Sequence, residues 1–514
     1  MISLVGALNH CAAEYADQPA IITADSVLSH GEFAILSDRV AAGLVERGLQ
    51  PGDRVAIYLP NGPDFAVAYA GIVKAGAVVV PVNLLINTEE ICYILNDAAV
   101  RALIFDDSLK DRVGRFVSAI PSLMFGVQVG GETSGDLILF PELKASDAPT
   151  PQPCINAETD LAAIIYTSGT TGFPKGAMLT HANLVSNTRS VHSAMRWRSG
   201  SDIALVVLPM FHAFAATVGM LTPLTQGCAF VPLARFEPDS VADAIHRHGA
   251  TIFLGVPSMY AVMLRLRDDR VGHLASLRCC IAGGAAMPVE VLRRFESRFG
   301  VSIYEGDGPT ECSPVTCVNP VEGLAKPGTV GLPVPNVEMK IVDDKGQTLP
   351  DGEVGEIAVR GPNVMKGYWK QEQATAEVFR EGWFLTGDLG TRDEDGYFSI
   401  VDRKKDLIIV NGMNVYPRMI EEVLQRFPGL REVAVVGELS ELHGEIPVAF
   451  VVLDEVADGS EAALRTFCRE HLGRHQIPRR FILLPELPKN ATGKIMKREL
   501  RKQGEVERGI TGLD

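Results

Sequence analysis

The chain has 514 residues, of which 46% are hydrophobic and 22% charged, and its formal net charge is −15. That length exceeds what one hydrophobic core supports, so we expect two or more domains, and the composition is ordinary for a globular protein. The acidic balance argues against a nucleic-acid-binding protein and against simple electrostatic adhesion to anionic lipid. The nine cysteines are an odd number without a C-x-x-C pair, so neither a disulfide framework nor a zinc site is indicated.

The amino-terminal segment lacks the basic region and cleavage signature of a signal peptide. The most apolar stretch, residues 65–85, contains Lys74 and Pro81, which predicts a helix, a turn and a strand and not a membrane span. We therefore expect a cytoplasmic protein without a transmembrane segment. Peripheral contact with a membrane and formation of a homodimer stay open.

Short apolar runs alternate with helical patterns through the first four hundred residues. Helices are expected at 239–248 and 288–299. This alternation predicts an α/β fold built from βαβ units, with largely parallel sheets and helices on both faces. The expected strands include residues 54–58, 77–80, 103–105, 203–208, 251–254 and 278–281.

The pattern changes towards the carboxyl terminus. Residues 329–400 contain short strands separated by Asp/Gly turns, which indicates a small β subdomain at the end of an amino-terminal domain of residues 1–401. The charged residues 402–406 then form a candidate hinge. Residues 407–514 are enough for a small α+β domain. In it we expect helices at 418–427 and 460–471, strands at 433–436 and 449–453, and a basic tail.

Residues 166–176 read Tyr-Thr-Ser-Gly-Thr-Thr-Gly-Phe-Pro-Lys-Gly and follow the apolar run 161–165. Glycines let backbone N–H groups approach an anion, hydroxyl groups add donors and Lys175 adds charge, so this loop is expected to bind a polyphosphate. It is not a Walker A loop, because Gly172 is followed by Phe-Pro-Lys-Gly. A Ser/Thr/Gly-rich surface turn is the alternative interpretation.

Seven further segments join this loop in a fixed order along the chain. With them, the chain resembles the adenylate-forming superfamily of acyl-CoA synthetases, peptide-synthetase adenylation domains and luciferases. The segments are residues 208–214, 282–285, 304–311, 382–388, 402–406, 411–417 and 488–494.

The resemblance implies a two-step reaction. A carboxylate attacks the α-phosphate of ATP to give acyl-AMP and pyrophosphate, and a thiol then displaces AMP. In such transfers the protein mainly positions groups and neutralises charge. Lys494 matches the family's catalytic lysine, which bridges the attacking carboxylate and the α-phosphate. Lys489 and Lys497 are interpreted as ordinary surface lysines of the basic tail.

The resemblance also assigns the metal and nucleotide contacts. Glu311 matches the Mg²⁺-binding acidic residue, and one carboxylate suffices because Mg²⁺ keeps phosphate oxygens and waters as ligands. Thr167 is a second contact to metal or phosphate, and Thr310 is expected to hydrogen-bond the α-phosphate. The other implied nucleotide-binding residues are Ser168, Gly169, Thr170, Thr171, Gly172 and Lys175 for phosphate, Asp388 for ribose, Arg403 for ribose or phosphate, and Gly283, Gly284 and Ala285 for the adenine edge.

Asp307 departs from the family pattern, which often has an aromatic residue there to stack on adenine. An aspartate cannot stack, so we expect the backbone from Gly306 to Gly308 to pack against the base instead. In the resembled family, the carboxyl-terminal domain swings between two poses, one that places the catalytic lysine in the site and one that admits the thiol. The resemblance indicates Lys405 as the hinge, a solvated residue suited to a large change in φ and ψ. In the pose for thioester formation, residues 411–414 would line the tunnel that admits the pantetheine arm of CoA, and Gly412 is expected to keep that tunnel open.

The segment after Phe211 bears on the substrate. Peptide-synthetase domains usually place an aspartate there to pair with an α-amine, whereas this chain has His212 and no acidic residue before Glu237. His212 matches a residue beside the acyl pocket, with a core histidine as the alternative. The small apolar residues 213–221 and 255–260 indicate a hydrocarbon pocket, and they supply no arginine for a second carboxylate.

We therefore expect an enzyme that uses ATP, Mg²⁺ and CoA to convert a medium- or long-chain fatty acid into its acyl-CoA. An aromatic-acid:CoA ligase and an acyl-AMP ligase that loads a separate carrier protein are the alternatives. A luciferase-like oxygenase and a nucleotide sensor without enzymatic activity are less favoured. The sensor would need neither Lys494 nor Glu311.

Overall fold

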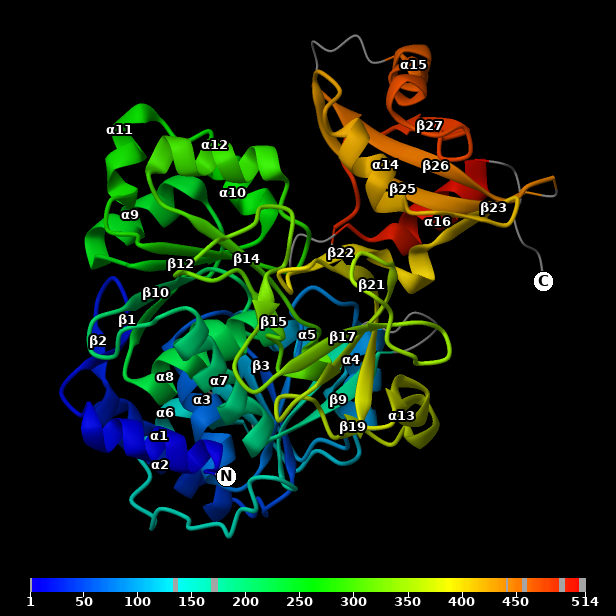
Figure 1. The fold of residues 1–514 in the computed structure, drawn as a ribbon. Helices are drawn as coiled ribbons and strands as arrows, with labels where there is room; N and C mark the ends of the chain where they lie inside the picture. The colour runs from blue at the N-terminus through cyan, green and yellow to red at the C-terminus, as the bar shows by residue number, and fades with distance from the viewer. Residues whose placement is uncertain are drawn as a thin grey trace. The chain divides into compact units, whose positions relative to one another are not determined.

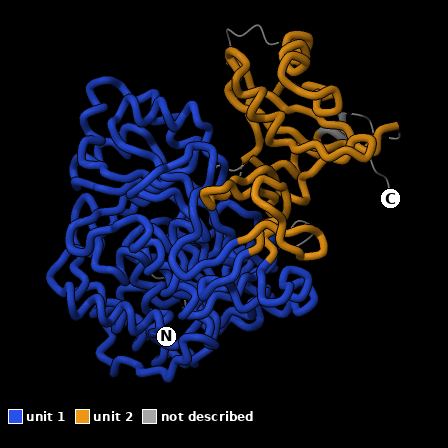
Figure 2. The backbone as a smooth tube through the Cα atoms, in the orientation of Figure 1, with its two compact units in different colours: residues 1–339, 359–384 blue, residues 340–358, 385–514 orange. Residues whose placement is uncertain are grey.

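The computed structural model describes residues 2–132, 137–167, 174–440, 442–454, 460–489 and 495–507. The chain forms two compact units (Figure 2). Unit 1 comprises Met1–Met339 and Val359–Phe384, and unit 2 comprises Lys340–Ala358 and Leu385–Asp514. The predicted α/β architecture is confirmed, because mostly parallel sheets with packed helices make up the larger part of the chain (Figure 1).

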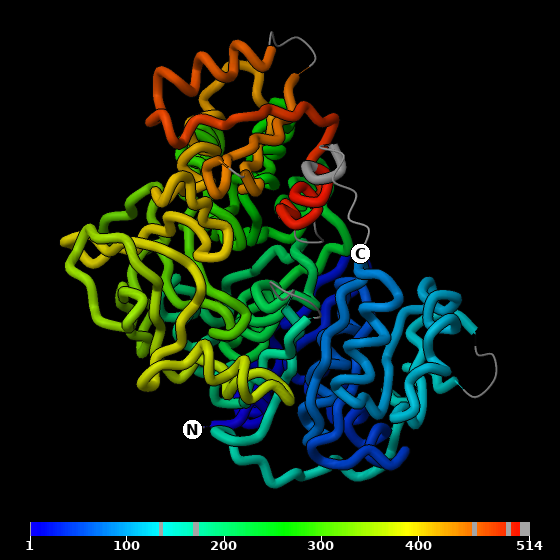
Figure 3. Tube along the Cα trace, turned by 90° about the vertical axis from the view of Figure 1, so that its right-hand side faces the viewer, coloured from blue at the N-terminus to red at the C-terminus, as the bar shows by residue number. Residues whose placement is uncertain are grey.

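Unit 1 contains an eight-stranded sheet in the order β19-β9-β8-β4-β3-β5-β6-β7. Figure 3 shows the runs of β3 to β6, blue to cyan, as neighbours. Tyr58 of β3 and Phe105 of β5 share one apolar core with Ile91 of the helix Thr88–Asp97. The strands are β3 (Arg54–Tyr58), β4 (Val78–Pro81), β5 (Ala102–Asp106), β6 (Phe125–Val129), β7 (Ile138–Leu139), β8 (Leu161–Thr167), β9 (Lys175–Thr180) and β19 (Gly367–Tyr368).

A second sheet of nine strands has the order β16-β15-β14-β13-β12-β10-β11-β1-β2. Its pairs from β1 through β11, β10, β12 and β13 to β14 are parallel. The strands are β1 (Pro19–Ile22), β2 (Val27–Ser29), β10 (Ile203–Val206), β11 (Ala229–Pro232), β12 (Ile252–Gly255), β13 (Cys279–Ala282), β14 (Ile303–Asp307), β15 (Cys317–Val318) and β16 (Leu332–Pro333).

The helices of unit 1 follow the expected amphipathic pattern: α9 and α12 bury Ile245 and Phe295 in one core with the second sheet. The helices are α1 (Leu4–Glu14), α2 (His30–Glu46), α3 (Pro63–Lys74), α4 (Thr88–Asp97), α5 (Lys110–Gly114), α6 (Phe140–Lys144), α7 (His181–Ala194), α8 (Thr222–Gln226), α9 (Pro238–His248), α10 (Pro257–Met263), α11 (Asp268–Val271), α12 (Val289–Phe299) and α13 (Glu372–Val378). The apolar stretch 65–85 forms most of α3, a turn and β4. Among the described residues, no helix has the length and apolar character to cross a membrane.

A small sheet has the order β17-β18-β21-β20, and β22 also pairs with β21; β20 and β22 are antiparallel to β21. Its strands are β17 (Glu338–Val342), β18 (Gly355–Arg360), β20 (Phe379–Arg380), β21 (Trp383–Arg392) and β22 (Phe398–Arg403). The carboxyl-terminal part of unit 2 has a sheet in the order β24-β23-β26-β25, with β27 beside β26. Its elements are β23 (Ile408–Val410), β24 (Met413–Val415), α14 (Pro417–Leu424), β25 (Leu430–Ser440), β26 (Gly444–Leu453), α15 (Glu461–His471), β27 (Arg480–Leu483) and α16 (Lys497–Glu507).

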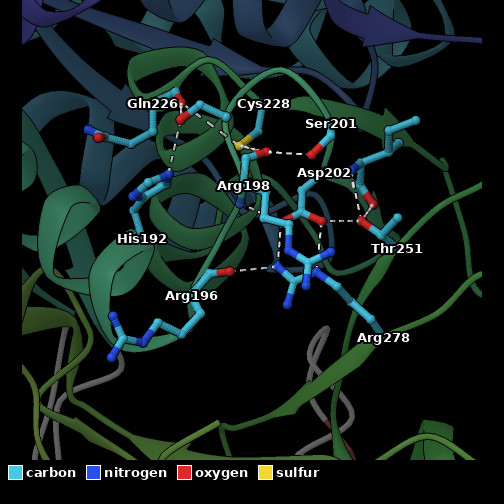
Figure 4. Close-up of polar contacts among 11 residues, drawn as sticks. His192, Arg196, Arg198, Ser201, Asp202, Gln226, Cys228, Thr251 and Arg278 are labelled. Atoms are coloured by element: carbon cyan, nitrogen blue, oxygen red, sulfur yellow. Dashed lines mark hydrogen bonds and ion pairs between the residues drawn. The ribbon is translucent and has the colours of Figure 1, made fainter. Parts of the chain in front are cut away.

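A buried polar cluster joins the amino ends of β10, β12 and β13 (Figure 4). Asp202 precedes β10 and accepts hydrogen bonds from the Arg198 N–H at 2.6 Å and the Thr251 hydroxyl at 2.8 Å. The guanidinium of Arg278 donates to both carboxylate oxygens, with its Nε at 2.8 Å from Oδ1. One carboxylate thus fixes the starts of three strands at the edge opposite their carboxyl ends.

Candidate active site

The second sheet brings several predicted site residues to one edge. Strands β10, β12, β13 and β14 are parallel neighbours, so their carboxyl ends lie at the same edge, where open α/β sheets commonly bind ligands (Figure 1). The segments that follow these strands are 207–214, 256–260, 283–285 and 308–311. They carry His212, the glycine pair predicted to face adenine, and Thr310 with Glu311.

Gly283 lets its segment lie close to β12, to β14 and to the segment 207–214. The Gly283 N–H donates to the Gly255 carbonyl oxygen at 3.4 Å. A Cβ atom at residue 283 would meet the Phe214 ring at 3.3 Å and the Gly306 carbonyl oxygen at 3.6 Å. Gly284 adopts a positive φ of 79°, which other residues rarely adopt. This close approach of backbone suits the predicted contact with a flat base. The assignment of Gly283, Gly284 and Ala285 to adenine stays a prediction.

The end of β14 also depends on glycine. A Cβ atom at Gly308 would lie 1.7 Å from the Pro314 carbonyl oxygen, and one at Gly306 would lie 2.9 Å from the Cys317 carbonyl oxygen. The Asp307 carbonyl oxygen accepts a hydrogen bond from the Thr316 N–H at 3.0 Å. Residues 306–308 therefore pack closely on residues 314–317. Their predicted contact with adenine is not tested by these contacts.

Thr310 and Glu311 lie on the short 3-10 turn Thr310–Cys312 directly after β14. The Tyr368 hydroxyl donates to Oε1 of Glu311 at 2.8 Å, and the Met365 N–H donates to the Glu311 carbonyl oxygen at 2.7 Å. Burial, followed by the charge of Glu311, raises the pKa of the Tyr368 phenol far above its usual value. The phenol therefore stays protonated and acts as the donor.

The ends of the predicted phosphate loop are described, and its centre is not. Thr167 and Lys175 are register partners at the ends of β8 and β9, and the Thr167 hydroxyl donates to the Lys175 carbonyl oxygen at 3.4 Å. The Lys175 ammonium lies over the Tyr368 ring, 5.1 Å from its centroid. The predicted phosphate contacts Ser168, Gly169, Thr170, Thr171 and Gly172 lie outside the described residues.

The residues around Glu311 fit Mg²⁺ that arrives with a nucleotide. Within the described part of the chain, no group of three His, Cys, Asp or Glu side chains could hold a metal ion by itself. A single carboxylate suits Mg²⁺, which keeps phosphate oxygens and waters as further ligands. Glu311 and Thr167 would hold the ion, and the ion would neutralise charge on the phosphates.

In unit 2, Asp388 and Arg403 are partners across β21 and β22. The Arg403 Nε lies 3.2 Å from Asp388 Oδ1, and the Asp388 N–H donates to the Thr386 hydroxyl at 3.1 Å. The Asp388 carboxylate is buried and charge-paired, as a fixed acceptor for hydroxyl groups would be. Its role towards ribose stays a prediction, as does the role of Arg403.

Two other predicted residues of unit 2 have clear local positions. Lys405 is exposed in the 3-10 turn Lys404–Asp406. Asn411 and Gly412 connect β23 to β24 with φ values of 50° and 78°, as a two-residue hairpin turn of type I′ requires. The structure thus gives Gly412 a turn role, whereas its place in a pantetheine tunnel stays a prediction. Lys494 lies outside the described residues.

His212 is half-buried, and its Nδ1 accepts a hydrogen bond from the Phe214 N–H at 3.3 Å. The next residues form a buried π-helix, Ala215–Leu221, which sequence patterns do not predict. Such helices often occur at functional sites because they bulge a helix locally.

Tyr368 was missed by the sequence analysis. It lies 57 positions from Glu311, and its contact depends on the pairing of β19 with β9. Nothing local in Gly367-Tyr368-Trp369 indicates that pairing.

The prediction that Lys497 is an ordinary surface lysine was wrong. Its ammonium lies 2.8 Å from Glu421 Oε1, and its side chain is only 20% exposed.

Comparison with known proteins agrees with this arrangement. Residues 8–369 match the family model "AMP-binding enzyme", and residues 419–494 match the model "AMP-binding enzyme C-terminal domain". The long-chain-fatty-acid–CoA ligase of Bacillus subtilis (strain 168) is 36% identical over 534 residues, which cover 98% of this chain and 94% of the relative. Feruloyl-CoA synthase of an Amycolatopsis species is 36% identical over 484 residues, covering 93% and 94%. The crystal structure of ATP-bound MatB from Rhodopseudomonas palustris matches with a TM-score of 0.90 at 33% identity, covering 98% of this chain and 99% of that one.

Proposed function

The chain belongs to the family of AMP-binding enzymes and is an AMP-forming acid–CoA ligase, and we propose that its acid is a medium- or long-chain fatty acid. ATP and CoA are its co-substrates. In the first step, a carboxylate oxygen of the acid attacks the α-phosphorus, and the bond between the α-phosphorus and the bridging oxygen breaks to release pyrophosphate. In the second step, the CoA sulfur attacks the acyl carbon, AMP leaves with the bonding electron pair, and the thiol proton passes to solvent.

The residues of the chain act in this scheme mainly through charge and position. Lys175 and Thr310 are proposed to hold phosphate oxygens, and Lys494 to stabilise the charge that develops between carboxylate and α-phosphate. Glu311 and Thr167 would hold Mg²⁺. Asp388 would accept hydrogen bonds from the ribose hydroxyls, and Arg403, whose Nε lies 3.2 Å from Asp388 Oδ1, would contact ribose or phosphate.

The observation that carries the choice of acid is the uncharged wall of the proposed acyl pocket. Residues 208–221 and 252–260, which follow or form β10 and β12, contain no Asp, Glu, Lys or Arg. Most of these side chains are buried, including Met210, Ala213, Val218 and Met220. A wall of this composition favours a hydrocarbon chain and offers no cation for a second acidic group. The long-chain-fatty-acid–CoA ligase relative supports the same choice.

An aromatic acid is the second candidate, and the similarity to a feruloyl-CoA synthase favours it. An apolar wall accepts a ring as well as a chain, and His212 could face the hydroxyl group of such an acid. A third candidate transfers the acyl group to a carrier protein. It would form acyl-AMP but would not depend on free CoA.

A CoA-dependent AMP-release screen tests the proposal. It compares butanoate, octanoate, dodecanoate, hexadecanoate, benzoate and ferulate at fixed ATP, Mg²⁺ and CoA. We expect the highest kcat/KM for octanoate or a longer fatty acid. A higher kcat/KM for benzoate or ferulate would contradict the fatty-acid assignment. Acid-dependent pyrophosphate exchange without CoA-dependent AMP release would indicate the carrier protein.

A further inference from the structure

We propose that Tyr368 is a positioning residue that sets the Glu311 carboxylate and the Lys175 ammonium in place for Mg²⁺ and ATP phosphates. This inference rests on the proposed function, since it takes Glu311 as the metal ligand and Lys175 as a phosphate ligand. The structure adds that one side chain, Tyr368, contacts both of these residues. All three residues belong to unit 1.

One tyrosine side chain contacts both residues with different parts of its ring. Its hydroxyl donates to Glu311 Oε1 at 2.8 Å, and its aromatic face lies under the Lys175 Nζ, 5.1 Å from the centroid. A cation above a tyrosine ring is attracted by the negative face of the ring. Tyr368 is only 8% exposed, so neither contact competes freely with water.

The backbone of Tyr368 is held on both sides. It pairs with Ala177 in the antiparallel register of β19 and β9, and the Trp369 N–H donates to the Gly176 carbonyl oxygen at 2.8 Å. Its own N–H donates to the Thr375 hydroxyl at 2.9 Å, which ties β19 to α13. A ring attached to so constrained a backbone can orient its partners.

The turn that carries Glu311 is held by the same segment. The Met365 N–H donates to the Glu311 carbonyl oxygen at 2.7 Å, the Asn363 side-chain amide donates to the Cys312 carbonyl oxygen at 2.9 Å, and the Ser313 hydroxyl donates to the Asn363 carbonyl oxygen at 2.8 Å. Residues 363–368 thus fix the backbone of Glu311 and one of its carboxylate oxygens. The second oxygen, Oε2, accepts no hydrogen bond within the described part of the chain and is left to serve the metal.

This arrangement fixes the metal ligand relative to the phosphate ligand before the nucleotide binds. A glutamate side chain that rotates freely loses conformational entropy when it binds a metal ion, and this loss weakens binding. A carboxylate that is already held in position avoids the loss. The hydroxyl and the ring have separable effects, because only the hydroxyl contacts Glu311. Removal of the hydroxyl should weaken the dependence on Mg²⁺, and removal of the ring should also release Lys175.

The test measures ATP binding by isothermal titration calorimetry over a series of Mg²⁺ concentrations and again in EDTA. The variants are Tyr368→Phe, Tyr368→Leu and the control Tyr69→Phe, whose buried hydroxyl has no hydrogen-bond partner in the described structure. We expect Tyr368→Phe to raise the Mg²⁺ concentration for half-maximal ATP binding by about tenfold, the usual effect of one charge-assisted hydrogen bond. Its ATP affinity in EDTA should stay unchanged, whereas Tyr368→Leu should lower it.

Two results would overturn the inference. One is an unchanged Mg²⁺ requirement in Tyr368→Phe. The other is a loss of ATP affinity in Tyr368→Phe that is equal with Mg²⁺ and with EDTA, because this would indicate a general structural effect.

A double-mutant cycle with Glu311→Gln gives an independent check. If Tyr368 acts through Glu311, the variant with both substitutions should bind MgATP only slightly more weakly than Glu311→Gln alone. If the losses in binding free energy of the two single variants add up in the double variant, the inference is contradicted. Failure of the wild-type protein to bind MgATP would refute the proposed function itself, whatever the variants do.

Discussion

Asp202 is a buried carboxylate whose charge is matched within one cluster of side chains (Figure 4). Burial by itself would raise the pKa of Asp202, but the Arg278 guanidinium, the Arg198 N–H and the Thr251 hydroxyl together hold it below its usual value. Asp202, Thr251 and Arg278 each precede a different strand, so the cluster stabilises the second sheet at the edge opposite the candidate site.

We expect Asp202→Asn to destabilise unit 1 by about 2–3 kcal/mol, since Arg278 would lose its anionic partner and a buried hydrogen-bond network would be broken. The measurement is the thermal midpoint by calorimetry. The control is Asp269→Asn, which removes the partner of Arg267 at 3.2 Å in an ion pair whose side chains are about two-thirds exposed. Such a pair contributes little, so the control should melt like the wild type.

The stabilisation that the Asp202 carboxylate provides should decrease as the pH falls. The folded pKa of Asp202 lies below the unfolded value of about 3.9, so its contribution is complete above about pH 4 and is lost as the pH falls through the folded pKa. The difference in stability between wild type and Asp202→Asn should therefore narrow below pH 4. A difference that stayed constant down to pH 2 would show that the charge of Asp202 is not the cause.

At this scale, motifs with a chemical signature could be predicted from the sequence, and contacts that depend on strand pairing could not. Glu311 was indicated by its Gly-Pro-Thr-Glu context and does lie on a turn at the carboxyl end of a parallel strand. Its partner Tyr368 could not be predicted, because an aromatic residue in a short strand is usually a packing residue. Asp202 and Arg278, 76 positions apart, were also missed for this reason.

At the scale of elements, the candidate hinge 402–406 is anchored at its ends to two helices of unit 2. The Asp402 carboxylate accepts from the Arg418 N–H of α14 at 2.9 Å, and Asp406 pairs with Arg501 of α16 at 2.6 Å. Burial would lower the pKa of Lys497, but the carboxylates of Glu421, Asp402 and Asp406 raise it, so this buried ammonium stays charged between them. The exposed Lys405 is thus the position in this segment best suited to a backbone rotation.

We expect Lys405→Pro to preserve adenylation and to impair thioester formation, because proline fixes φ near −65° and blocks the rotation that the second step would need. Pyrophosphate exchange measures the first step, and acyl-CoA formation measures the second. Lys405→Ala removes the same charge while leaving φ free, so it should preserve both activities. Equal losses of both activities in Lys405→Pro would refute the hinge assignment.

Elements with a clear local pattern were predicted almost to their ends, as with β3, whose bounds Arg54–Tyr58 match the expected strand 54–58. The hairpin of β25 and β26 is longer than predicted, because its ladder continues through polar residues up to the pair Ser440 and Gly444. Helix α16 was taken for a basic tail, because Leu500 is the one apolar residue among its described side chains, residues 497–503. The ion pairs of α16, Lys497 with Glu421 and Arg501 with Asp406, join residues far apart in the sequence, so no local pattern indicates them.

At the scale of the whole molecule, the length of 514 residues implies more than one core, but the path of the chain could not be predicted. The chain passes between the two units within β17, β18 and β21, which pair with one another in a single sheet. The sequence suggested one passage near residue 402. That boundary stays a prediction. Of the proposed site residues, Lys175, Thr310 and Glu311 fall in the range of unit 1, and Asp388, Arg403 and Lys494 fall in the range of unit 2.

The proposed role of Lys494 can be tested separately from thioester formation, because it concerns only the adenylation step. If Lys494 stabilises the charge between carboxylate and α-phosphate, Lys494→Ala should reduce acid-dependent exchange of pyrophosphate into ATP by about 10²- to 10³-fold. The formation of acyl-CoA from supplied dodecanoyl-AMP and CoA should persist, since no phosphate bond is made or broken by the carboxylate in that step. Lys489→Ala is the matched control, because this lysine lies five positions earlier and pairs with Glu432 at 2.5 Å. Undiminished exchange in Lys494→Ala would exclude the proposed mechanism, and equal loss of both reactions would show that the substitution disturbs unit 2 instead.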